Sequence, residues 1–230
     1  ISLKSLIENK FTIDNLQAST KAIKINDLIL FFRSIKNSPE LFILDRIVKE
    51  GFLIADIKLN FNKDGEIKKN YKINGFIKNA KLDVLKKNDI NNLDLLFKIE
   101  KNRFLLKDIK GKFGQLILSA PTIDIKEKKN KFKINGKLIT EKKIINKDIV
   151  NDLFTKNFKK FDIKDIKFGS ENTFSLDISK KLKISNVKFE SLINLDNLKY
   201  EKESSNIKKY LPNFSKFIKL ENHKISINYH

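Results

Sequence analysis

One segment of the chain has side chains spaced like the ligands of a calcium-binding loop. Asn60, Asn62 and Asp64 recur at every second position and are followed by Gly65, as the oxygen ligands and the turn glycine are in an EF-hand. The twelfth position, where that loop needs a bidentate Glu, is Tyr71. The flanking residues also alternate as strands rather than helices. We therefore interpret the segment as a turn and predict no metal site.

Other motifs that could support chemistry or nucleic-acid binding are weak. The sequence GKFG at 111–114 has the spacing of the loop with which KH domains clamp a nucleic-acid backbone, but its flanks alternate as strands, whereas that loop joins two helices. The two histidines, His223 and His230, stand near the end of the chain without a partner. The chain has no Cys, and carboxylate pairs such as Asp162 and Asp165 are scattered. We predict a protein that is not an enzyme and takes no cofactor.

The charge of the chain is strongly positive, with 48 Lys and Arg against 28 Asp and Glu and a formal net charge of +20. Only three of the basic residues are Arg, and the Lys residues are spread over the whole length. Nucleic-acid surfaces usually combine clustered Arg and Lys with exposed aromatic residues. A chain rich in Lys, Ile, Asn and Phe is also what an AT-biased genome encodes. We expect no specific nucleic-acid partner.

Most of the sequence alternates apolar and polar residues with the period of a β-strand. The pattern starts at Leu53, Ala55, Ile57, Leu59 and Phe61 and resumes after a turn at 63–65. It then continues as short apolar runs through residue 138 and returns between 163 and 200. This predicts a long antiparallel meander whose strands each have one apolar face. A last strand is also predicted within 219–229.

A short sequence recurs within the meander. YKING at 71–75 returns as FKING at 132–136. An Asn-Gly pair often forms a hairpin turn, but the alternation runs straight through Ile73, Gly75 and Ile77. We therefore predict that these glycines lie inside strands.

Two stretches have helical spacing instead. Residues 26–50 predict two short amphipathic helices that meet at Ser38-Pro39, with Ser38 as the N-cap, Pro39 as the first helical residue and Gly51 as the stop. Residues 146–160 predict a third helix, with Lys residues near its C-terminal end. So few helices cannot cover a sheet of about a dozen strands, which at roughly 4.8 Å per strand is about 55 Å long. Either a second sheet covers the apolar face, or the sheet forms an open trough for an apolar ligand.

Three stretches resemble a known family. SPELFILDRIVKEGFLIADIKLNF at 38–61, YKINGFIKNAKLDVL at 71–85 and LKDIKGKFGQLILSAPTIDI at 106–125 are similar to the large AsmA-like, DUF3971-containing envelope proteins of Gram-negative bacteria. The resemblance implies a repeating β-groove that carries phospholipid between the inner and outer membranes. It also implies a periplasmic location and an inner-membrane anchor outside these residues. It brings no catalytic residue.

The predicted fold class is accordingly mainly β, a long antiparallel meander curled into an open β-groove with two short amphipathic helical segments. Residues 1–200 are expected to form a section of the groove, and 201–230 an irregular segment with a possible last strand. The chain starts with Ile1 and has no Met, so we expect it to be a processed chain or a section of a longer one. The residues predicted to line the groove and contact lipid are Leu53, Ile57, Leu59, Phe61, Ile73, Ile77, Leu82, Leu95, Phe97, Phe113, Leu116, Leu118, Ile134 and Leu138.

Two alternatives remain open at this point. The net charge also fits a basic module that binds nucleic acid or an anionic membrane surface. A closed β-sandwich with no ligand and a structural role in the cell envelope would explain the same strand pattern.

Overall fold

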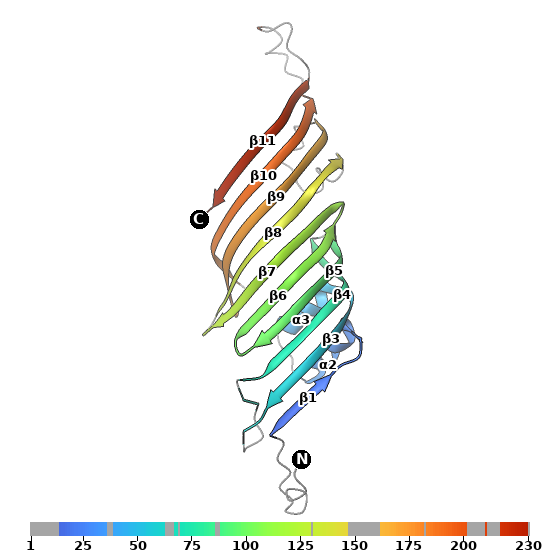
Figure 1. Cartoon of the computed structure of the whole chain (residues 1–230), viewed down its shortest axis with the longest axis vertical. Helices are drawn as coiled ribbons and strands as arrows, with labels where there is room; N and C mark the ends of the chain where they lie inside the picture. The colour runs from blue at the N-terminus through green and yellow to red at the C-terminus, as the bar shows by residue number, and fades with distance from the viewer. Residues whose placement is uncertain are drawn as a thin grey trace, which may run out of the picture.

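The strands of the protein form a single antiparallel meander. The computed structural model describes residues 14–35, 39–62, 67–68, 70–85, 88–129, 131–146, 162–181, 183–201, 210 and 217–229. Within these residues there is one sheet of 11 strands, in which β1 and β3 to β11 lie in chain order and β2 pairs with β3 (Figure 1). The strands are β1 (Asn15–Ser19), β2 (Ile23–Lys24), β3 (Val48–Asn60), β4 (Lys72–Leu85), β5 (Asn88–Glu100), β6 (Arg103–Phe113), β7 (Leu116–Lys128), β8 (Lys131–Asn146), β9 (Asp162–Ser179), β10 (Ile184–Glu201) and β11 (Phe217–Tyr229).

The sheet is open, as the sequence predicted, and no second sheet covers it in the described part of the chain. The strands succeed one another along the long axis of the molecule (Figure 1). The last strand is confirmed as β11. The predicted helix at 146–160 lies outside the described residues except for Asn146, which ends β8. The described residues therefore do not form the closed β-sandwich that was the alternative.

The predicted helical pair is confirmed as α2 (Ile25–Ile35) and α3 (Pro39–Ile47). Asp27 in the first turn and Arg33 in the last turn of α2 complement the helix dipole. Pro39 is the first residue of α3, where its missing N–H costs nothing. Both helices lie behind the sheet over its N-terminal strands (Figure 1).

The prediction that Gly51 stops the second helix is wrong. The helix ends at Ile47, and Gly51 is a residue of β3 with φ 135°. A Cβ at this position would come within 2.9 Å of Ala80 Cα and of Ile25 Cδ1. Glycine is needed because β4 and α2 approach the backbone of β3 closely there.

A line of irregular residues crosses the sheet. Asn79 in β4, Asn92 in β5 and Asp108 in β6 all have φ between 51° and 52°, and the pairing registers of β4 with β5 and of β5 with β6 shift beside them. Further shifts follow between Thr140 and Lys143 in β8 and next to Leu195 in β10. A β-bulge bends its strand and increases the local twist. The aligned bulges therefore bend neighbouring strands at the same level and curl the sheet.

The apolar contacts with α2 form the first of two buried clusters. Ile25 and Ile29 of α2 pack with Val48 of β3 and Ala80 of β4, and Ala80 is only 1% exposed. The second cluster, around Leu116 and Ile145, joins β7, β8 and β9 through Leu118, Ile166 and Phe168. The helices thus close only one section of the sheet.

Candidate functional site

Residues directly opposite each other in antiparallel strands share a face, so the strand registers show which side chains form rows across the sheet. On the face that packs against α2, these rows are apolar. What we call the first apolar row runs through Ala18, Ile57, Ile73, Ile99, Phe104, Ile125, Ile134 and Leu176, one from each strand from β1 to β9 in the path. The second apolar row runs through Ala55, Gly75, Phe97, Leu106, Ile123, Gly136, Phe174, Phe189 and Tyr229, from β3 to β11.

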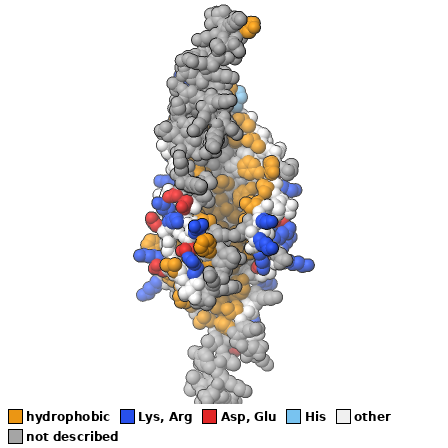
Figure 2. Space-filling view, turned by 180° about the vertical axis from the view of Figure 1, so that it is seen from behind, with side chains coloured by type: hydrophobic (Ala, Val, Ile, Leu, Met, Phe, Trp, Pro, Cys, Tyr) orange, Lys and Arg blue, Asp and Glu red, His pale blue; other side chains and the backbone are white. Residues whose placement is uncertain are grey.

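These rows form a stripe that no polar residue interrupts. The second row crosses nine strands, which are separated by eight spacings of about 4.8 Å, so it is roughly 38 Å long. Figure 2, which views the molecule from behind, shows hydrophobic side chains along the middle of this face and charged side chains along both sides. Most members of the two rows are half-buried, so their side chains are partly open to a ligand. We call this surface the groove face.

The two glycines of the repeated motif are both in the second row, inside strands as predicted. Gly75 in β4 is opposite Phe97, and Gly136 in β8 is opposite Phe174. A Cβ on Gly75 would lie 2.7 Å from the Phe97 ring, and one on Gly136 would lie 2.8 Å from the Phe174 ring. Each phenylalanine therefore lies across a glycine of the neighbouring strand, so the repeat is a repeat of packing as well as of sequence.

The residues predicted to line the groove fall into three sets in the structure. Ile57, Ile73, Ile134 and Phe97 belong to the two apolar rows. A second set packs against buried clusters instead, namely Leu53, Ile77 and Leu82 beneath α2 and Phe113, Leu116 and Leu118 in the cluster at β7 to β9. The remaining ones flank the rows: Leu59 opposite Leu16, Phe61 opposite Ile67, Leu95 opposite Ile77, and Leu138 opposite Asn172.

Several members of the rows were not singled out from the sequence. They include Leu106, Ile123, Phe174 and Phe189, which complete the second row. Their alternation is visible in the sequence, but only the strand registers show that they lie in one row with Phe97.

A small polar cluster lies beside the second apolar row at β8 to β10. Thr140, Ser170, Asn172 and Ser191 are all buried. The Asn172 amide donates to the Leu138 carbonyl at 3.1 Å and to Ser170 Oγ at 3.0 Å, and Ser191 Oγ donates to Asn172 Oδ1 at 2.6 Å. Because Ser170, Asn172 and Ser191 satisfy one another, the cluster is tolerated beside apolar neighbours.

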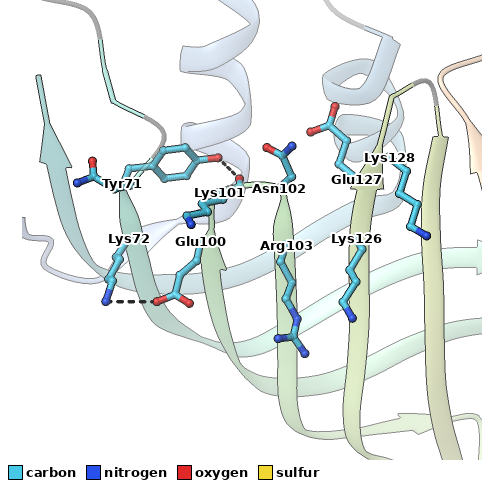
Figure 3. A pocket seen from close by; sticks show the side chains of 10 residues that line it. Tyr71, Lys72, Glu100, Lys101, Asn102, Arg103, Lys126, Glu127 and Lys128 are labelled. Atoms are coloured by element: carbon cyan, nitrogen blue, oxygen red, sulfur yellow. Dashed lines mark hydrogen bonds and ion pairs between the residues drawn. The ribbon is translucent and has the colours of Figure 1, made fainter. Parts of the chain in front are cut away.

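One edge of the sheet, where the β5–β6 and β7–β8 turns lie, is densely charged. A cavity of about 560 Å³ opens there between residues 70–72, 100–103 and 126–128 (Figure 3). Arg103 donates to both carboxylate oxygens of Asp124, at 2.7 and 3.1 Å, and Lys126 lies 3.2 Å from the same group. The Arg103 hydrogen bond is the main reason that the pKa of Asp124 is lowered, and in turn it raises the pKa of Arg103.

The carboxylate of Glu100 is held in the same way. Lys98 Nζ lies 2.9 Å and Lys72 Nζ 3.6 Å from Glu100 Oε1, and the Lys98 hydrogen bond is the largest cause of the lowered pKa of Glu100. Tyr71 Oη donates to the Lys101 carbonyl at 2.5 Å, which ties the start of β4 to the β5–β6 turn. These contacts connect the start of β4 with the end of β5, and the start of β6 with β7, around the cavity.

The weaker motifs have structural roles or lie partly outside the described residues. Gly111 is a buried residue of β6, and Gly114, with φ 57°, is in the turn to β7, so the GKFG segment is a hairpin as its flanks indicated. His223 is exposed in β11, where its Nδ1 lies 2.7 Å from the Glu221 carbonyl oxygen. Residues 63–66 of the calcium-like segment lie outside the described residues. No group of three or more His, Cys, Asp or Glu in the described ranges could hold a metal ion.

No family model, curated protein or solved structure matches this chain. Among the described helices, none is long and apolar enough to cross a membrane. The groove face is therefore the feature of this chain from which its function is inferred.

Proposed function

We propose that this protein is a non-enzymatic lipid conduit, in which acyl chains of phospholipids lie along the groove face. The observation that carries the proposal is the pair of apolar rows on an open sheet that α2 covers only at β3 to β5. An exposed apolar stripe of this size in water is unfavourable unless something covers it.

The dimensions of the stripe suit lipid rather than a small metabolite. One acyl chain spans half of a bilayer core that is about 30 Å thick, whereas the second apolar row crosses nine strands. Several lipids could therefore lie side by side along the face. Apolar side chains that offer no directional hydrogen bonds permit such molecules to slide, which is what a conduit requires.

The cellular setting follows from the resemblance to AsmA-like envelope proteins. Under this proposal the chain is a section of a periplasmic groove between the inner and outer membranes of a Gram-negative bacterium, anchored by a segment outside these residues. The line of bulges supports this assignment because it gives the sheet the curl that a groove needs.

The high positive charge favours a second candidate, a basic module for nucleic acid or an anionic membrane surface. Some of the Lys residues are engaged in local ion pairs, such as Lys131 with Asp177 at 2.7 Å and Lys142 with Asp196 at 2.8 Å. The aromatic residues of the second apolar row are on the groove face rather than interleaved with these cations. Both features favour the conduit.

Native mass spectrometry of the purified protein tests the proposal. We expect phospholipid to remain bound after purification from membrane-containing cells, and to remain bound after a wash in 1 M salt, because burial of acyl chains does not weaken with ionic strength. Lipid-free protein that instead binds DNA tightly, with an affinity that falls steeply as salt rises, would favour the basic module.

A further inference from the structure

We propose that the charged edge of the groove binds the phosphate of an anionic lipid, whose acyl chains lie on the adjacent apolar rows. This inference rests on the proposed conduit function and adds a lipid class and an orientation to it. The site is the cavity of about 560 Å³ bounded by the start of β4, the β5–β6 turn and the end of β7 (Figure 3).

The lining of the cavity has an excess of positive charge. Its basic residues are Lys72, Lys101, Arg103, Lys126 and Lys128, and its acidic residues are Glu100 and Glu127. Both carboxylates already have a cation nearby, since Glu100 is paired with Lys98 and Lys72, and Glu127 lies 3.5 Å from Lys180 Nζ. Arg103 and Lys126 are both held by Asp124.

Two cations of the lining remain available to a ligand. Lys101 and Lys128 form no ion pair with any residue that the structure describes, and both are exposed. Lys128 also borders a neighbouring cavity of about 700 Å³ with Lys129, Lys131 and Ser179, so the basic surface continues along the same edge. A Lys ammonium is a compact point charge with three donors, and it binds phosphate readily.

The position of the cavity relative to the apolar rows identifies the phosphate as that of a lipid. Ile99 and Phe104 of the first apolar row flank the β5–β6 turn, and Ile125 precedes the cavity residues at the end of β7. At about 3.4 Å per residue along the strands, the β5–β6 turn lies within roughly 7 Å of this row. Lys126 and Lys128 alternate with Ile125 and therefore lie on the opposite face of the sheet, so the cavity is at the rim where the two faces meet. A lipid with its chains on the rows would thus extend its phosphate over the rim, between Lys101 in the turn and Lys128 at the end of β7.

The test uses water-soluble lipids and two double variants, each of which replaces two Lys by Glu and so changes the net charge by the same amount. The probes are dihexanoyl phosphatidylglycerol, which is anionic, and dihexanoyl phosphatidylcholine, which is neutral overall, with glycerophosphoglycerol and inorganic phosphate as probes without acyl chains. The test variant is Lys101→Glu with Lys128→Glu. The control is Lys110→Glu with Lys112→Glu, which changes the charge equally on β6 toward the opposite edge of the sheet, where both side chains are exposed. Thermal melting establishes that both variants are folded.

We expect the unmodified protein to bind the anionic lipid about tenfold more tightly than the neutral one. The test variant should lose this preference and keep its affinity for the neutral lipid, and the control should retain the preference. Equal binding of both lipids by the unmodified protein, or an equal loss in the control, overturns the inference and leaves the conduit standing. Inorganic phosphate or glycerophosphoglycerol bound as tightly as the lipid also overturns it, because the site would then be independent of the groove. Absence of binding to either lipid contradicts the conduit itself.

Discussion

Phe97→Asp is expected to remove bound lipid from the protein, whereas Leu96→Asp is expected to leave it in place. The two residues are neighbours in β5 but face opposite sides of the sheet: Phe97 is in the second apolar row, and Leu96, which is 46% exposed, is opposite Phe76 on the outer face. A carboxylate on the groove face keeps water near it, since burying an unpaired charge against acyl chains is too costly.

The measurement compares lipid that copurifies with each variant, together with the melting temperature. We expect at least a tenfold loss of lipid for Phe97→Asp and less than a twofold change for Leu96→Asp. Phe97→Asp should also cost about 2 kcal/mol of stability because the ring that covers Gly75 is lost, while a surface change such as Leu96→Asp usually stays within about 0.5 kcal/mol.

If Phe97→Asp fails to fold, Leu106→Asp in the same row takes its place, since its side chain covers no glycine. Equal lipid in the variants on both faces would contradict the assignment of the groove face.

Gly75→Ala is expected to destabilise the sheet by about 3 kcal/mol, at the upper end of the usual cost of overpacking. A Cβ at this position would lie 2.2 Å from the Ile54 carbonyl oxygen and 2.7 Å from the Phe97 ring. The carbonyl belongs to the backbone of β3, so relief of the contact requires a shift of a whole strand.

Two further glycines serve as controls in the same denaturant titration. Gly136→Ala should cost less than Gly75→Ala, because its three nearest atoms are side-chain atoms of Phe174 and Ile123, which can move. Gly114→Ala should cost about 1 kcal/mol, from its left-handed backbone alone, since no atom lies within 4 Å of its Cβ position. Equal losses at all three positions would mean that glycine flexibility, rather than close approach of β3 and Phe97, determines the cost.

The elements of the fold could be predicted from local pattern. Pro39 and the helical spacing of residues 26–50 indicated α2 and α3, and the period-2 alternation indicated the meander. The strand lengths could not be predicted in the same way. Asn79 and Asp108 each add a residue in a left-handed conformation, which shifts the alternation within β4 and β6 and makes one long strand resemble two short ones.

The groove face was predicted less completely, for two physical reasons. Alternation within one strand does not give its register with the next, so the contact of Phe97 with Leu106 and the place of Phe174 in the second row were not foreseen. An amphipathic helix also does not reveal which part of the sheet it will cover. Ile25 and Ile29 of α2 belong to a buried cluster against which Leu53 and Ile77 pack. The sequence pattern predicts lipid contact for both of these leucine and isoleucine side chains.

Photo-crosslinking to lipid at defined positions shows directly which face of the sheet contacts phospholipid. A photoreactive amino acid is placed at Ile57, Leu106 and Phe189 on the groove face, and at Leu96 and Ile117 on the outer face, in cells whose phospholipids are radiolabelled. We expect phospholipid adducts at all three groove positions and none at the two outer positions. Adducts that are absent from the groove positions, or equally abundant on both faces, would contradict the proposed conduit.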